Sequence, residues 1–227
     1  MKTKRKALVA VLCAAALVAT TFVATVAWLT DTEEVTNTFT VGKVDIKVDE
    51  ADVDLYGEPV AGAARVADNE YKLIPGYTYV KDPTMTVVAG SEESYVRMIV
   101  TFTEASKLKE IFGNPFLPQN FVDGWDNTKW VTTGVITEEN NTLSYEFRYC
   151  TTVDARDGEK VLEPLFTSFT LPTTLTGEQV TEIGNLTITV EGHAGQTAGF
   201  VADTVNNKTA EDVAWEAFAA QLAATNP

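Results

Sequence analysis

Residues 96–102 read Val-Arg-Met-Ile-Val-Thr-Phe, and this stretch decides the fold class. Every even position is large and apolar, whereas the odd positions include Arg97 and Thr101. A period of two is typical of a β-strand with one buried face. We therefore expect a central strand here. The residues expected in its core face are Val96, Met98, Val100 and Phe102.

Two further segments downstream show strand patterns. The pattern from Lys129 to Tyr149 predicts a hairpin, with the Glu-Glu-Asn-Asn sequence of residues 138–141 as its turn. A late strand is marked by Leu186, Ile188 and Val190. Many short strands separated by turn signals favour a mainly β fold, namely an antiparallel β-sandwich of jelly-roll type.

The period becomes helical between Thr209 and Ala224, which predicts a short C-terminal helix. Thr209 is a suitable N-cap, because its hydroxyl can accept a hydrogen bond from the first turn. The predicted buried face consists of Val213, Phe218, Ala219 and Leu222, with Trp215 at its edge. We expect residues 50–227 to form one β-sandwich domain, preceded by an extended segment over residues 28–49.

The charge of the chain is strongly acidic. It has 227 residues with 17 Lys and Arg against 32 Asp and Glu, a formal net charge of −15. A surface of this sign repels nucleic acid and anionic lipid, so both are excluded as default partners. The acidity is typical of a soluble exported protein. Carboxylates can also bind Ca²⁺ outside the cell, and that alternative stays open.

The N-terminus resembles an export signal. Basic residues occupy four of the first six positions, and an uncharged stretch from Ala7 to Leu29 follows. That stretch is long enough for a retained membrane anchor. Its Ala- and Thr-rich composition and the small residues Thr25 and Ala27 favour cleavage between Ala27 and Trp28 instead. We expect residues 1–27 to be a signal peptide and the mature protein to be secreted.

Only two cysteines occur, Cys13 and Cys150. Cleavage after Ala27 would remove Cys13, so the mature chain would have no internal disulfide. Cys150 ends the alternating run that begins at Leu143, and we expect it to be a small buried side chain.

The junction over residues 27–42, Ala-Trp-Leu-Thr-Asp-Thr-Glu-Glu-Val-Thr-Asn-Thr-Phe-Thr-Val-Gly, resembles that of the TasA/camelysin family. The family pattern is a small residue, an aromatic or apolar pair, a small hydroxyl residue, Asp and an Asn-x-Phe-x-x-Gly run. Trp28 stands where Tyr or Phe is more usual. Weaker similarity returns at residues 73–76, 95–97, 164–167 and 199–200.

The resemblance implies a secreted subunit of biofilm matrix fibres in Gram-positive bacteria, cut by a SipW-type signal peptidase during export. Its expected partner is itself, in a head-to-tail polymer joined by donor-strand exchange. The candidate donor strand runs from Thr36 to Val48. Its site residues are Thr38, Phe39, Val41, Gly42, Val44, Ile46 and Val48. The alternative is that these residues form the first strand of their own domain.

A camelysin-like metalloprotease is a second hypothesis, and the single histidine argues against it. A hydrolytic zinc site commonly uses two histidines one helical turn apart, and this chain has only His193. We expect His193 to be an ordinary surface residue, and we expect no catalytic residue, no metal ligand and no cofactor. Asp52 and Asp54 resemble the opening of a calcium loop, but Ala63 stands where the closing Glu belongs.

A third hypothesis is a monomeric adhesin or glycan-binding module. Trp125 and Trp130 lie five residues apart and could form a platform on which a sugar ring stacks. The alternative is that both rings are buried anchors of the core. We expect the second, because large aromatic side chains contribute most when they are buried.

Overall fold

The computed structural model describes residues 43–225, apart from the side chains of Val135, Leu222 and Thr225. Its strands are β1 (Ile46–Asp49), β2 (Thr78–Val80), β3 (Thr84–Val87), β4 (Ser91–Phe102), β5 (Val122–Asp123), β6 (Trp130–Glu139), β7 (Thr142–Tyr149), β8 (Val153–Ala155), β9 (Lys160–Val161), β10 (Ser168–Thr170) and β11 (Ile188–Gln196). Its helices are α2 (Ala105–Phe112), the 3₁₀ turn η1 (Pro118–Asn120), α3 (Gly177–Glu182) and α4 (Ala210–Thr225).

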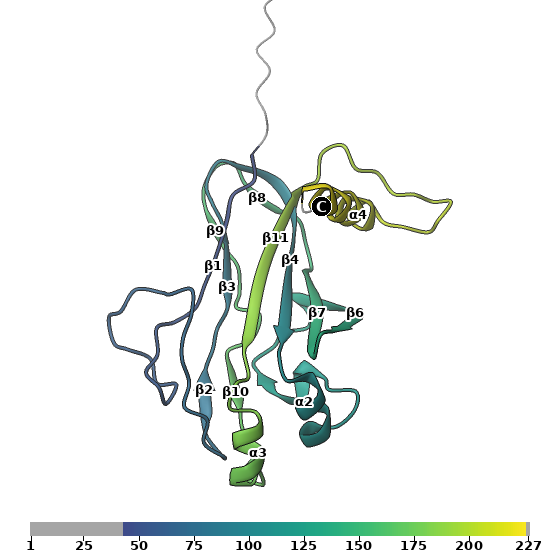
Figure 1. The fold of residues 1–227 in the computed structure, drawn as a ribbon. Helices are drawn as coiled ribbons and strands as arrows, with labels where there is room; N and C mark the ends of the chain where they lie inside the picture. The colour runs from purple at the N-terminus through teal and green to yellow at the C-terminus, as the bar shows by residue number, and fades with distance from the viewer. Residues whose placement is uncertain (1–42, 226–227) are drawn as a thin grey trace, which may run out of the picture. The chain divides into compact units, whose positions relative to one another are not determined.

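The strands form two layers around one core (Figure 1). One layer is an antiparallel sheet in the order β11-β4-β7-β6, with β8 paired to one end of β4. The other contains two three-stranded antiparallel sheets, β1-β3-β9 and β2-β10-β5. The predicted mainly-β sandwich with a short C-terminal helix is confirmed.

Strand β4 is the centre of the core, as its alternation predicts. Its four even-numbered apolar side chains are all at most 1% exposed. Phe102 touches three other rings edge-on, with centroids 5.2 Å from Phe116, 6.1 Å from Phe121 and 5.9 Å from Tyr145. This ring cluster fills the space between the layers, where aromatic pairs prefer edge-to-face contact.

The predicted hairpin is confirmed as β6 and β7. Glu139 pairs with Thr142, so Asn140 and Asn141 alone make the turn. Both have positive φ angles of 50° and 61°, as the two central residues of a type I′ turn require. Asparagine tolerates this conformation better than most residues, which explains the local sequence.

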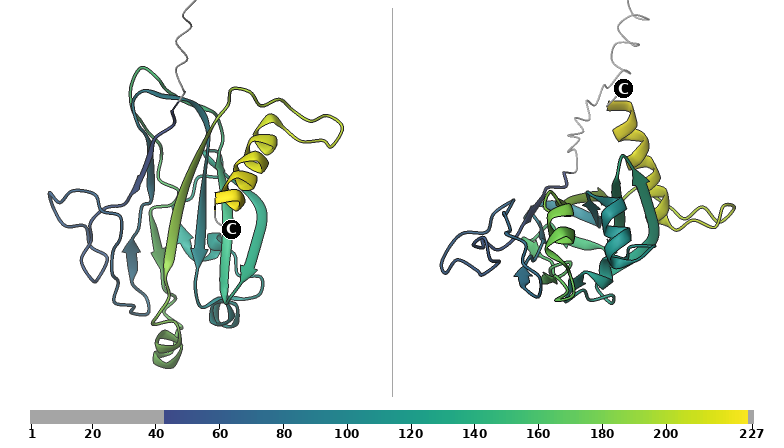
Figure 2. Two further views of the ribbon diagram at one scale, coloured as in Figure 1. Left: turned by 45° about the horizontal axis from the view of Figure 1, so that its top comes forward. Right: turned by 60° about the horizontal axis from the view of Figure 1, so that its bottom comes forward.

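Helix α4 covers the outer face of the first sheet, but with a different face from the predicted one (Figure 2). Ala214 and Trp215 are buried, whereas Ala219 is exposed. Trp215 is central because the Arg97 guanidinium lies 4.3 Å from its ring centroid. The helical period was right, and the predicted face was right at Phe218, which packs on Trp215 and His193, but wrong at Ala219. The packed face is centred on Trp215 because the covered strands present the Arg97 charge and not an apolar stripe.

Asp212 stabilises the first turn of α4 through hydrogen bonds with Thr209. Its Oδ2 accepts hydrogen bonds from the N–H and hydroxyl of Thr209, while the Asp212 N–H donates back to Thr209 Oγ1. Thr209 is thus the N-cap, as predicted. Arg148 Nη1 also donates to Asp212 Oδ1 over 2.6 Å, which ties the helix to strand β7.

This contact predicts a pH dependence of helix docking. The Arg148 hydrogen bond, followed by those from Thr209, lowers the pKa of Asp212 from 3.8 to about 2. A lowered pKa in the folded state means that Asp212 stabilises fully above pH 3.8 and loses that effect as the pH falls through about 2. We expect Asp212→Asn to lower the melting temperature at pH 6, and the difference from wild type to shrink as the pH falls from 3.8 to about 2 and to vanish below that. Asp157→Asn, at an exposed turn, is the control, and an Asp212→Asn difference of the same size at pH 6 and at pH 2 would contradict the assignment.

Candidate functional site

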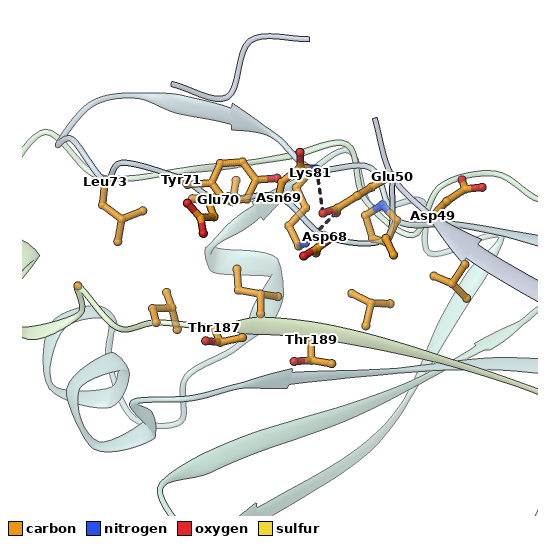
Figure 3. Close-up of a pocket in the computed structure, with 18 residues that line it drawn as sticks. Asp49, Glu50, Asp68, Asn69, Glu70, Tyr71, Leu73, Lys81, Thr187 and Thr189 are labelled. Atoms are coloured by element: carbon orange, nitrogen blue, oxygen red, sulfur yellow. Dashed lines mark hydrogen bonds and ion pairs between the residues drawn. The ribbon is translucent and has the colours of Figure 1, made fainter. Parts of the chain in front are cut away.

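A groove of about 420 Å³ opens between the two layers at one side of the sandwich (Figure 3). One wall is the start of β11 with the residues just before it, from Gly184 to Val190. The opposite wall is the end of β1 and the loop segment 67–73. The floor includes Lys81, Pro83 and Phe169.

The groove exists because the layers touch at only one end of β11. At Gly192 an added Cβ atom would lie 2.5 Å from both Val48 Cγ2 and Met85 Cε, so only glycine lets β1 approach this closely. Beyond Asp49 the chain leaves the sheet for the irregular segment 50–77, which holds only isolated bridges such as Glu50–Val66. The loop 67–73 and the first residues of β11 are therefore separated from each other, and the space between them is the groove.

Strand β11 offers an open edge along this groove. It pairs with β4 on one side, and in the described part of the chain no strand pairs with its other side. The side chains of Ile188 and Val190 are half-buried and line the groove. An edge of this kind, beside an apolar wall, can accept an added β-strand.

The loop wall carries charge, and the floor holds a closed ion pair. Asp68 and Glu70 are exposed on the loop. Lys81 Nζ lies 2.7 Å from Glu50 Oε2, with side chains 8% and 5% exposed. Asn69 joins them by donating Nδ2 to Glu50 Oε1 over 3.0 Å. An uncharged segment therefore suits the groove better than an acidic one, since it meets the two wall carboxylates without like-charge repulsion.

The candidate donor segment falls partly outside the described residues. This applies to Thr38, Phe39, Val41 and Gly42, and also to the signal cleavage site at Ala27 and Trp28. Ile46 and Val48 belong to β1, which pairs with β3 of the same chain in the register Ile46–Val87 and Val48–Met85. Val44 precedes that strand and is half-buried. The first described strand is therefore Ile46–Asp49, and just before it the carbonyls of Lys43 and Asp45 accept hydrogen bonds from the N–H groups of Glu92 and Val88.

His193 is not the surface residue we predicted. It lies inside β11 opposite Arg97, and its side chain is 13% exposed. Its Nδ1 accepts a hydrogen bond from Arg97 Nε over 3.1 Å, and its ring packs 5.0 Å from that of Phe218. The helix α4 buries it, which the sequence around position 193 does not indicate. Within residues 43–225 no group of three His, Cys, Asp or Glu side chains is arranged to hold a metal ion.

The calcium-loop resemblance has a local explanation. Asp54 Oδ1 accepts hydrogen bonds from the N–H groups of Tyr56 and Glu58, over 2.8 and 3.0 Å. Gly57 completes this turn with a φ of 79°. The aspartate therefore closes its own turn, as Asx residues often do.

Two other predictions concern the burial of Cys150 and of the two tryptophans, Trp125 and Trp130. Cys150 is exposed, because β7 ends at Tyr149 and Cys150 begins the following turn, so the prediction of a buried side chain was wrong. Trp130 is fully buried and donates Nε1 to the Glu163 carbonyl, while Trp125 donates Nε1 to the Trp130 carbonyl. Both rings are anchors of the core, as expected, and they form no sugar platform.

Comparisons with known proteins assign no family to this chain. No protein-family model, no curated protein and no solved structure matches the chain. Among the described helices none is long and apolar enough to cross a membrane. Sequence reasoning missed three polar residues of the groove, namely Glu50 after β1, Asn69 in the loop wall and Lys81 on the floor. They lie in separate, irregular stretches with no periodic pattern.

Proposed function

We propose that this chain is an exported structural subunit that assembles into extracellular fibres, and that the groove beside β11 accepts the N-terminal segment of a neighbouring subunit. The open edge of β11 beside a groove is the observation that carries this proposal. An inserted segment would pair with the free backbone groups of β11 and bury apolar side chains between the layers.

The sequence contains a segment of suitable chemistry. Residues 35–42, Val-Thr-Asn-Thr-Phe-Thr-Val-Gly, have no charged side chain, and Phe39 and Val41 alternate with threonines. The acidic residues Asp31, Glu33 and Glu34 precede this run. Because Asp68 and Glu70 line the groove wall, the uncharged run is the part that fits, and the acidic part would remain outside it.

The polarity of the domain suits an open polymer. Strand β1 enters at the end of the sandwich opposite α3, whereas the groove extends from Val48 towards Gly184, just after α3 (Figure 1). A subunit that gives a strand at one end and receives one near the other makes a heterologous contact. Repetition of such a contact produces a filament and not a closed dimer.

Binding of the isolated segment tests this proposal directly. A synthetic peptide of residues 31–44 is expected to bind a chain that starts at residue 43, with one peptide per chain, in isothermal titration calorimetry. A peptide with Phe39→Asp and Val41→Asp is the matched control and should not bind, because both changes replace apolar contact with Ile188 and Val190 by carboxylates that face Asp68 and Glu70. Ile188→Trp, at a half-buried position on the β11 wall of the groove, should block binding of the native peptide. Equal binding to the Ile188→Trp chain would move the acceptor site elsewhere.

A further inference from the structure

Three side chains from different parts of the chain meet at the groove floor (Figure 3). Glu50 follows β1, Asn69 lies in the loop wall and Lys81 follows β2. Each oxygen of the Glu50 carboxylate has one partner: Oε2 lies 2.7 Å from Lys81 Nζ, and Oε1 accepts from Asn69 Nδ2 over 3.0 Å. Glu50 is 4% exposed and Lys81 7%. One carboxylate therefore binds both an amine and a primary amide, with Glu50 and Lys81 shielded from bulk water and Asn69 half-buried.

The orientation of the amide is determined by its other contacts. Asn69 Oδ1 accepts the N–H of Val53 over 3.0 Å, and Nδ2 also donates to the Ala51 carbonyl over 2.8 Å. The amide oxygen thus faces a backbone donor, and the amide nitrogen faces the carboxylate. A backbone N–H at this oxygen would stabilise the negative charge that develops there if a nucleophile attacked the amide carbon.

We propose that Lys81 and Asn69 become joined by an intramolecular isopeptide bond, with Glu50 transferring the protons. Glu50 first accepts a proton from the Lys81 ammonium, which leaves a neutral amine. Lys81 Nζ then forms a bond to Asn69 Cγ, and the electron pair of the C=O bond moves to Oδ1, near the Val53 N–H.

The bond from Cγ to Nδ2 breaks next. Glu50 returns its proton to Nδ2, the C=O bond re-forms, and Nδ2 departs as NH₃. Glu50 then takes the surplus proton from the Lys81 nitrogen and passes it to the ammonia, which leaves as NH₄⁺. One ammonium side chain and one primary amide become one secondary amide and one NH₄⁺ ion, with no oxidant, reductant or co-reactant. Glu50 ends as the carboxylate that it was at the start, so it acts as a general base and acid.

The surroundings of the three side chains limit their access to water. Glu50 and Lys81 are both buried, so a proton transfer from Lys81 to Glu50 would remove two charges that are shielded from solvent. Burial, followed by the charge of Glu50, raises the pKa of the neighbouring Tyr71, so this region is desolvated. Asn69 is held by the Val53 N–H and the Ala51 carbonyl, and Glu50 binds both Asn69 and Lys81. Such fixed proximity replaces a bimolecular encounter with an intramolecular one.

The bond would attach the loop wall of the groove to its floor. Asn69 lies within the segment 67–73 and Lys81 adjoins β2, so both belong to the side of the groove that faces β11. A covalent link between them would fix the loop wall to the layer that carries β2, whatever occupies the groove. The inference stands on this geometry and does not require the proposed function.

Mass spectrometry of the purified full chain tests the proposal. We expect an intact mass lower than the sequence mass by one ammonia molecule. Trypsin should not cut at the acylated Lys81, so peptide 66–72 should be recovered covalently joined to peptide 73–97. This joined peptide distinguishes the isopeptide bond from loss of ammonia by ring closure at an asparagine. An unchanged intact mass, with peptides 66–72 and 73–81 recovered separately, would overturn the proposal whatever the variants show.

Variants assign the roles. Lys81→Arg keeps the positive charge beside Glu50 but should lose the joined peptide completely. Glu50→Gln removes the proton carrier and should slow bond formation by a factor on the order of 10² or more. Glu146→Gln is the matched control, because Glu146 forms a comparably shielded ion pair with Arg97 at 3.1 Å in the other layer. It should give the wild-type joined peptide, and a joined peptide that persisted in Lys81→Arg would overturn the assignment of Lys81.

Discussion

Deletion of residues 31–42 from the exported chain is expected to abolish filament formation while leaving the sandwich folded. The deletion removes the proposed donor segment and keeps β1, which begins at Ile46 and pairs with β3. Since the described core starts beyond the deleted residues, the free energy of unfolding should change little. Negative-stain electron microscopy should show filaments for the wild-type chain and none for the deletion, and size-exclusion chromatography should show a monomer.

A charge variant in the same segment is the appropriate control. Glu33→Gln with Glu34→Gln keeps the uncharged run of residues 35–42, so this double variant should still form filaments. Filaments from the deletion chain would eliminate the N-terminal segment as the donor. A monomeric wild-type chain under all conditions of salt, pH and calcium would instead favour the adhesin hypothesis, with the aromatic surface to be sought outside Trp125 and Trp130.

Phe102→Ala is expected to cause the largest loss of stability of any single substitution considered. Phe102 is fully buried and lies among Phe116, Phe121 and Tyr145. Removal of such a ring costs about 3–5 kcal/mol, because both burial and packing are lost. Domains are stable by only about 5–15 kcal/mol, so this variant should be close to unfolding at room temperature.

Chemical denaturation monitored by tryptophan fluorescence measures this effect. Val161→Ala is the control, because Val161 is 64% exposed on β9 and its truncation should change stability by less than about 0.5 kcal/mol. If Phe102→Ala lowered the free energy of unfolding by less than about 1 kcal/mol, with an unchanged denaturant slope, the ring cluster would not be a main source of the stability of the core.

Local patterns were sufficient for much of the fold. The alternation around Val100 predicted β4, and the Asn140–Asn141 pair predicted the turn between β6 and β7. The Thr209 cap predicted the start of α4. These features depend on residues close together in the chain, since side-chain period, turn chemistry and capping are local properties. A sequence can be searched for them without knowledge of its partners in space.

Features that depend on contacts between distant segments were predicted less well. The buried face of α4 was assigned wrongly at Ala219 because the helix packs on Arg97, more than a hundred residues away. His193 and Cys150 were also misplaced, one buried beneath a helix and the other exposed where a strand ends. In each case burial depends on which segment covers the residue, and short-range patterns do not contain that information.

By itself the sequence determined the central strand β4, the β6–β7 hairpin, the late strand at Ile188 and Val190, the terminal helix, the acidic charge and the uncharged run at residues 35–42. Only the tertiary structure decided where the sandwich remains open, and that Gly192 closes it at one end. It alone brought Glu50, Asn69 and Lys81 within hydrogen-bonding distance. The physical reason is that periodicity follows from the geometry of one strand or helix, whereas a groove and a three-residue site follow from how separate segments pack.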